Sequence, residues 1–292
     1  MKGNVSKIVV HKGQAHADEL MACALYYGVT GNTVPIYRRD PTEEELGDPT
    51  VLVMDVGLRH EPDLLNFDHH QLQPEDELPD CAATLVAKEL GLHDTLKLQP
   101  WYRNMATLDA LGPFKLAKRM GLKDFPFGLL SPLEMGIKKA FEEAEDEHEV
   151  ASWIVTALKV IGTAMIKDAV RYAINYERLL DVDVVRLHGP DGTAVDVIIN
   201  EDSDTTGIQA ARDARNKNDP ADIAASISFD DRGEGWALYR FNDDPRVDFT
   251  RLCGRDEILF CHNGGFIAKT KERLEREEVL ALVAEALVKE AT

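Results

Sequence analysis

Residues 66–71 have the sequence NFDHHQ, which places one carboxylate and two imidazoles on consecutive positions. Asp68, His69 and His70 can bind metal ions or transfer protons. In an extended segment successive side chains point to opposite faces, so at most two of the three can share a site. The third must support them or contact a substrate. For this segment alone, a polar turn that carries two histidines is the alternative interpretation.

More side chains of these two types occur elsewhere in the N-terminal half. They are His11, His16, Asp18, Asp55 and Asp109. Imidazole and carboxylate ligands suit Mn, Co, Fe, Zn or Mg, and the nitrogen content favours a transition metal over Mg alone. Seven or more candidate ligands are too many for one ion. They fit two ions that share a bridging carboxylate, an arrangement that activates a water and holds a phosphoryl group.

The surrounding segments alternate between strand and helix patterns. We expect strands within residues 6–14, 33–40, 50–57 and 64–70, and helices over residues 16–28, 81–92 and 100–112. This alternation predicts a mostly parallel sheet with helices on both faces. Functional side chains gather at the carboxyl ends of such strands, where all the candidates except Asp109 are found.

Each candidate ligand also has a purely structural explanation. His11 could be an ordinary histidine at a strand end, and Asp55 a solvated turn residue. Asp18 could be an acid that the helix dipole favours in a first turn, and Asp109 a plain surface residue. Because these coincidences would all have to occur together, we favour the metal site.

The remainder of the chain predicts a connecting helix and a second domain. We expect a metal-binding catalytic domain at 1–140, a connecting helix at 141–180 and a substrate-binding domain at 181–292. The second domain is expected to be a smaller α+β unit. It would contain a hairpin with an HGPDG turn, a helix, further strands, and an amphipathic helix from Lys271 onward.

The chain has 292 residues and a hydrophobic fraction of 44%, which is typical of globular proteins. It contains no apolar run of membrane-spanning length. The N-terminus lacks a signal-peptide pattern, so we expect a cytoplasmic protein without a membrane partner. The four cysteines are scattered and form no CxxC pair, which indicates neither a disulfide framework nor a zinc knuckle.

The formal net charge of −19 excludes a broad basic surface for long nucleic acids. A short anionic substrate is compatible with this charge if bound cations and a few local arginines neutralise it.

Four motifs occur in a recognisable order: HKGQAHADE at 11–19, VMDVG at 53–57, FDHHQ at 67–71 and LDALG at 108–112. They resemble the N-terminal motifs of the DHH phosphoesterase superfamily. Together with CHNGGFIAK at 261–269, they look like its melanocyte-proliferating-gene branch, often labelled metal-dependent protein hydrolases. The resemblance implies a dinuclear metal site in the N-terminal domain and a C-terminal domain that closes over the substrate. The implied activity is phosphodiester hydrolysis, as a 3′ to 5′ exonuclease on RNA or short oligonucleotides.

The resemblance also implies a role for each residue of the metal site. His11 would bind one ion and Asp18 the other, with Asp55 bridging both. His69 and Asp109 would complete the shell of the second ion. His16 stands where many superfamily members have an aspartate, after five residues rather than four, so its role and the metal preference stay open.

For the histidine pair, the resemblance makes His70 the group that faces the substrate, as a phosphate contact or proton donor. Asp68 would orient an imidazole without binding a metal ion itself. We therefore expect His70 and Asp68 to be catalytic. The expected cofactors are two divalent metal ions, with Mn as our choice and Mg, Co or Zn as alternatives.

The C-terminal motif predicts a substrate-binding wall. Paired glycines, Gly264 and Gly265, would let backbone N–H groups approach an oxyanion, and His262 would touch the same anion. Arg240 and Arg255 are candidates for bidentate phosphate contacts. A tight turn with two surface arginines is the alternative.

The sequence therefore predicts a phosphodiesterase whose partner is a short RNA, an oligonucleotide or a small phosphate ester. Two other functions stay open. A phosphohydrolase acting on pyrophosphate or a nucleotide would need the same first domain, and a non-enzymatic module could retain or have lost the metal site. A substrate panel and a metal analysis would separate them. A homodimer is also left open.

Overall fold

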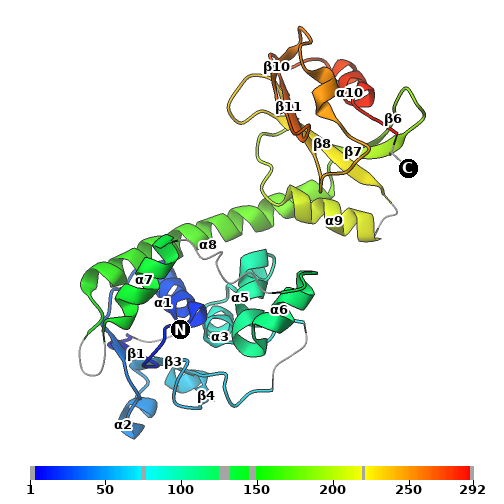
Figure 1. Cartoon of the computed structure of the whole chain (residues 1–292). Coiled ribbons are helices and arrows are strands. Elements are labelled where there is room, and N and C mark those ends of the chain that lie inside the picture. The colour runs from blue at the N-terminus through cyan, green and yellow to red at the C-terminus, as the bar shows by residue number, and fades with distance from the viewer. Residues whose placement is uncertain (1–3, 74–76, 125–131, 145–148, 219–220, 290–292) are drawn as a thin grey trace. The chain divides into compact units, whose positions relative to one another are not determined.

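The computed structural model describes residues 4–73, 77–124, 132–144, 149–218 and 221–289. The chain divides into two compact units, Met1–Val170 and Arg171–Thr292. The boundary falls within a long helix, α8 (Ser152–Leu180), which is green in Figure 1. Each unit is built around its own sheet, so the two are described separately.

The sheet of the first unit has five strands in the order β2-β1-β3-β5-β4. Their bounds are β1 (Lys7–Val10), β2 (Ile36–Arg38), β3 (Val51–Met54), β4 (His60–Glu61) and β5 (Asn66–Phe67). All pairs are parallel except β4 with β5. The mostly parallel sheet is thus confirmed. The strand expected over 64–70 is only the two residues of β5, because Leu65 takes a positive φ of 56° just before it.

Alternation along the strands divides the first unit into two cores. Ile8, Val10, Leu52 and Met54 join the larger cluster, which also holds residues of α1 (Ala17–Thr30) and α3 (Ala82–Glu89). Val9, Val51 and Val53 point the other way and pack with Leu46 of the single-turn helix α2 (Glu43–Leu46). Helices therefore lie on both faces, as a buried parallel sheet requires.

Further helices follow α3 in the first unit: α4 (His93–Leu96), α5 (Pro100–Leu111), α6 (Pro113–Arg119) and α7 (Pro132–Glu142). The Gly-Pro pair at 112–113 ends α5 as expected, but Pro113 also begins α6. Proline is well suited to a first helical position because its missing N–H would have no partner there.

Helix α8 begins at Ser152, later than the connecting helix expected from residue 141. Before it, the backbone N–H of Val150 donates to the carbonyl of Ile36 at 2.9 Å, and Glu149 forms a β-bridge with Tyr37. This pairing with the edge of β2 prevents helical geometry at these two residues. Part of the expected helix, residues 145–148, lies outside the described residues.

The sheet of the second unit has six strands in the order β10-β11-β9-β8-β7-β6. Their bounds are β6 (Val184–His188), β7 (Ala194–Asn200), β8 (Ile223–Phe229), β9 (Trp236–Arg240), β10 (Ile258–Cys261) and β11 (Ile267–Thr270). The expected hairpin is the antiparallel pair β6 and β7. Only β7 and β8 are parallel, and α9 (Ile208–Asn218) connects them. The α+β character of this unit is confirmed.

Two helices cover opposite faces of this second sheet. On one face, Val279, Leu282 and Val283 of α10 (Arg276–Glu285) pack in the main cluster. On the other, Ile208 and Ala211 of α9 pack in a smaller one. The C-terminal helix begins five residues after Lys271, because Glu275 caps it and the carboxylate of Glu278 accepts from the Glu275 N–H.

The cysteine prediction was wrong for one pair. Cys253 and Cys261 form a disulfide, with their Cα atoms 5.6 Å apart. Cys253 follows the 3-10 turn Phe249–Leu252 and Cys261 ends β10, so the fold brings together two residues that no CxxC spacing marks. Cys23 and Cys81 are buried free thiols. Among the described residues, no helix is long and apolar enough to cross a membrane.

Candidate metal centre

The candidate ligands of the first unit converge at one edge of its sheet. His11 directly follows β1, Asp55 follows β3, and Asp68 follows β5. Because β1, β3 and β5 are parallel neighbours, their carboxyl ends bring these residues together. His16 is the N-cap of α1, Asp18 lies in its first turn, and Asp109 lies in the last turn of α5.

Asp55 lies at the centre of this arrangement. Its Oδ2 is 3.3 Å from Nε2 of His11, and its Oδ1 is 3.3 Å from Nε2 of His69. Both oxygens are buried without a hydrogen-bond partner. The residue also has a φ of 60°, a conformation that costs free energy for a residue with a side chain. One carboxylate thus presents an oxygen to each of two neighbouring histidines, as a bridging ligand would.

A second carboxylate, Asp109 of α5, contacts one histidine that follows β5 and another at the start of α1. Its Oδ2 lies 3.0 Å from Nε2 of His69, and its Oδ1 lies 3.8 Å from Nδ1 of His16. Asp18 is fully buried beside it, and its Oδ2 accepts a hydrogen bond from the backbone N–H of Ala82 at 3.1 Å. Its other oxygen, Oδ1, has no hydrogen-bond partner.

Three groups of side chains have ligand atoms within 4.8 Å of one another. They are His11, His16 and Asp55; Asp55, His69 and His70; and His16, Asp18 and Asp109. Asp55 and His16 each belong to two groups. The structure therefore brings together all six residues expected to bind metal.

His69 and His70 have different surroundings. The His69 side chain is about 10% exposed and lies among the carboxylates. The His70 side chain is about 50% exposed, and its Nδ1 lies 2.6 Å from Oδ1 of Asp68. Asp68 is itself fixed, since its carboxylate accepts from the backbone N–H groups of His70 at 2.9 Å and Leu58 at 2.7 Å. This contact holds the His70 ring, and the supporting role of Asp68 in catalysis stays a prediction.

Burial and mutual repulsion perturb the acids of this centre. Burial, followed by the charges of Asp55 and Asp109, raises the pKa of Asp18 well above its ordinary value. Burial also raises the pKa of Asp109, but the adjacent His69 outweighs it and leaves that pKa lowered. For His69 burial lowers the pKa, whereas Asp109 and Asp55 raise it to a net value of about 10. Without a cation, this protein thus gathers carboxylates that repel one another in a buried space.

The unpaired polar atoms fit a metal centre. His11 Nε2, Asp18 Oδ1, both Asp55 oxygens and Asp109 Oδ2 are buried and lack hydrogen-bond partners. Buried polar atoms normally have partners, and leaving one unpaired costs about 1–3 kcal/mol. Divalent cations would coordinate these lone pairs and neutralise the carboxylates. The mixed nitrogen and oxygen donors suit a transition metal.

Sequence reasoning gave no role to two buried residues beside this centre, Glu19 and Arg38. Both are fully buried, and Arg38 Nη2 lies 3.7 Å from Glu19 Oε1. Glu19 Oε1 is also 3.5 Å from His11 Nε2. Burial raises the pKa of Glu19 to about 8, although Arg38 opposes this. The sequence showed only that Arg38 is a charged residue within an expected strand, and its place beside β1 comes from the fold.

The five expected substrate contacts lie in the second unit. Arg240 donates to the carbonyls of Val247 at 2.9 Å and Gly264 at 3.1 Å, and pairs with Asp243. Arg255 pairs with Glu285 and Glu257. Both arginines thus already have partners in this structure, and their contact with phosphate stays a prediction.

The glycine pair forms a tight turn between β10 and β11. Gly265 has a φ of +67°, and a Cβ there would lie 2.5 Å from Asp248 Oδ1. The N–H of Gly264 donates to Nδ1 of His262 at 3.0 Å, and the His262 ring packs on Phe266 with centroids 4.2 Å apart. The oxyanion role of this turn is likewise untested.

Comparison with known proteins supports the resemblance for part of the chain. Residues 7–90 match MYG1_exonuc, described as an uncharacterised protein family (UPF0160). This segment holds the first three motifs and ends before Asp109. No curated protein matches the chain.

Two solved structures are similar at low identity. One is a putative family II inorganic pyrophosphatase of Methanococcus jannaschii, with 16% identity and a TM-score of 0.26 over 96% of this chain and 99% of that one. The other is the DHH domain of a member of the s1p family of ribosomal proteins, with 13% identity and a TM-score of 0.29 over 97% and 86%.

Proposed function

We propose that this protein is a metal-dependent phosphodiesterase that degrades RNA or short oligonucleotides from the 3′ end. The observation that carries the proposal is Asp55, whose two buried oxygens face His11 and His69 at 3.3 Å each. A shared carboxylate between two groups of ligands is the arrangement expected for two metal ions. The match of residues 7–90 to the MYG1_exonuc family supports hydrolysis as the chemistry.

Six side chains would hold the two ions: His11, His16, Asp18, Asp55, His69 and Asp109. Bound divalent ions would supply Lewis-acid chemistry, lowering the pKa of a water and offsetting the charge of a phosphoryl group. The chain contributes the fixed positions of these donors. Asp55 is held in its strained backbone conformation by the strand end, and Asp18 by the N–H of Ala82.

His70 would be the residue that acts on the substrate. Its ring is half exposed, and Nδ1 lies 2.6 Å from Oδ1 of Asp68, so an N–H at Nδ1 would donate to this carboxylate. A protonated ring would then donate from Nε2 to the oxygen that leaves, while Asp68 stabilises the positive charge. This division of roles depends on the difference in exposure between His70 and the enclosed His69.

The test is hydrolysis by the purified full chain, stripped with a chelator and then loaded with Mn²⁺. Substrates would be a 5′-labelled oligoribonucleotide, the matching DNA, a dinucleotide and pyrophosphate. We expect a ladder of RNA products shortened from the 3′ end. Hydrolysis of pyrophosphate alone would indicate a small-molecule phosphohydrolase instead. If no substrate is hydrolysed with Mn²⁺, Mg²⁺, Co²⁺ or Zn²⁺, both functions are contradicted.

A matched pair of variants distinguishes hydrolysis at the metal centre from hydrolysis by contaminating nucleases. Asp55→Asn keeps the size of the side chain but removes the charge, so hydrolysis should fall at least a thousandfold. Asp94→Asn makes the same change on α4, where the side chain is 88% exposed, and should retain full activity. Equal activity in both variants would show that the hydrolysis does not arise at this centre.

A further inference from the structure

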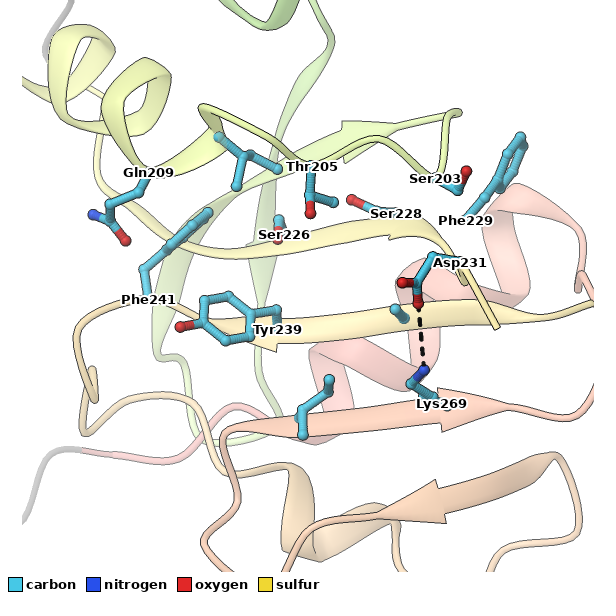
Figure 2. Close-up of a pocket in the computed structure, with 13 residues that line it drawn as sticks. Ser203, Thr205, Gln209, Ser226, Ser228, Phe229, Asp231, Tyr239, Phe241 and Lys269 are labelled. Carbon is cyan, nitrogen blue, oxygen red and sulfur yellow. Dashed lines mark ion pairs between the residues drawn. The ribbon is translucent and has the colours of Figure 1, made fainter. Parts of the chain in front are cut away.

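The second unit contains a pocket of about 310 Å³ that the candidate metal centre does not use. This volume is at the lower end of the range for small-molecule sites. Figure 2 shows its floor on three neighbouring strands, with the loop after β7 and the start of α9 above. Three strands and a helix thus build one cavity.

Strand register explains how the floor forms. Ser226 of β8, Tyr239 of β9 and Ile267 of β11 form one row across the sheet. Ser228, Ala237 and Lys269 form the next row. The residues between them, including Ile227, Leu238 and Ala268, point to the opposite face and pack in the main cluster. This part of the sheet therefore offers small and polar side chains on the face of α9.

One end of the pocket is aromatic. Tyr239 is 39% exposed, and its ring lies edge-on to Phe241, with centroids 5.6 Å apart. Phe241 is fully buried and holds this arrangement. Gln209 lies above the two rings (Figure 2). Its Nε2 donates one N–H to Asp213 at 3.0 Å, which leaves the second N–H and the amide oxygen for a ligand.

The other end is polar but not positive. Lys269 pairs with the buried Asp230, and its Nζ lies 3.9 Å from Asp231 Oδ1, the contact dashed in Figure 2. Two carboxylates thus face one ammonium group. Asp231 also pairs with Arg232 at 3.8 Å, so the cations at this end are already paired with carboxylates. Neutral hydroxyl groups of a ligand could donate to Asp231 and bond to Ser203 and Ser228.

We propose that this pocket binds a ribonucleoside, with the base against Tyr239 and the ribose near Asp231. An exposed aromatic ring on a sheet face is a common platform for an unpaired base. The amide oxygen of Gln209 would accept from an N–H of the base edge. A carboxylate is a frequent partner of ribose hydroxyls in nucleotide sites. The pocket alone indicates this ligand, and its use in recognising one residue of an RNA substrate rests on the proposed function.

Isothermal titration calorimetry of the metal-stripped full chain tests the proposal. The titrants are adenosine, guanosine, cytidine and uridine, each compared with free ribose and inorganic phosphate. Nucleosides contain no phosphoester bond, so the result does not depend on hydrolysis. We expect at least one nucleoside to bind with 1:1 stoichiometry, and ribose and phosphate to show no saturable binding.

Variants locate the binding. Tyr239→Ala should weaken it at least tenfold through loss of base stacking, and Tyr239→Phe should retain it. Gln209→Leu should weaken it less than Tyr239→Ala, and it tests the pocket even if Tyr239→Ala does not fold. Phe260→Ala is the matched control, since Phe260 is an exposed aromatic residue of β10 outside the pocket. The proposal is overturned if no nucleoside binds, if phosphate binds better, or if Tyr239→Ala and Phe260→Ala bind equally well.

Discussion

Nδ1 of His70 lies 2.6 Å from Oδ1 of Asp68. The contact holds a half-exposed imidazole at the edge of the candidate metal centre. The adjacent His69 turns its ring inward, where Nε2 lies 3.0 Å from Asp109 and 3.3 Å from Asp55. Two consecutive histidines therefore have different surroundings, and this leads to different predictions for their removal.

His69→Ala should lower metal occupancy, and His70→Ala should retain it. The first change removes an enclosed candidate ligand, for which we expect affinity for Mn²⁺ to fall at least tenfold. The second removes the group that we propose for proton transfer, for which turnover should fall by about 10²–10⁴. Metal content by mass spectrometry of dialysed protein, together with kcat, distinguishes the two. The opposite pattern would exchange the two roles.

At pH 9, where Glu19 with its pKa of about 8 is ionised, Arg38→Met should destabilise the first unit by about 3 kcal/mol, the usual cost of breaking a buried ion pair. The fully buried Arg38 lies 3.7 Å from Glu19 and donates to the carbonyl of Gly13 at 2.8 Å. Urea unfolding followed by circular dichroism would measure the change. Adding Glu19→Gln should recover part of the loss, because no carboxylate then remains without its partner.

A surface pair provides the control for this experiment. Arg59 pairs with Glu43 at 2.6 Å, but their side chains are 34% and 83% exposed. Such pairs contribute about 0–1 kcal/mol, so Arg59→Met should change the free energy of unfolding little. Similar losses from the two Arg→Met variants would show that the Arg38 pair is not special.

The candidate centre was predictable because parallel strands bring their carboxyl ends to one edge. A strand ending at His11 and another ending at Asp55 place both side chains at this edge, and β1 and β3 are neighbours in the sheet. The pairing of Glu19 with Arg38 could not be predicted, since it depends on which strand neighbours β1. The disulfide between Cys253 and Cys261 depends in the same way on a turn that no local pattern shows.

The pocket of the second unit was invisible in the sequence for a similar reason. Ser226, Tyr239 and Ile267 belong to three different strands, and only their register places them in one row. Alternation in each strand predicts which residues share a face, but not which strands are neighbours. Pairing of β9 with β11, rather than with β10, is a property of the whole fold.

Asp204 should make the stability of the second unit depend on pH below about 4. Arg171 Nε donates to its Oδ2 at 2.6 Å, and this bond lowers the pKa of Asp204 from 3.8 to about 2. The folded state thus favours the charged form. Its contribution is complete above the ordinary pKa and is lost as pH falls from about 4 to 2.

Urea unfolding of wild type and Asp204→Asn at pH 5 and pH 2.5 tests this dependence. The wild type should be the more stable at pH 5, by no more than about 1 kcal/mol because the pair is partly exposed. At pH 2.5 the difference between the two proteins should shrink. A difference that stays constant between the two pH values would contradict the assignment.

The same substitution, Gly→Ala, should have opposite effects at two positions of the first unit. Gly162 of α8 lies against α1, where an added Cβ would come within 1.8 Å of the carbonyl oxygen of Ala24. Gly136 of α7 is exposed, with nothing within 4 Å of an added Cβ.

Alanine is favoured over glycine inside a helix by about 0.8–1 kcal/mol. Gly136→Ala should therefore stabilise the protein by up to this amount. Gly162→Ala should destabilise it by more than about 2 kcal/mol, because two backbones must separate. Thermal unfolding of both variants measures the two signs, and a Gly162→Ala variant as stable as wild type would show that α1 and α8 do not pack this closely.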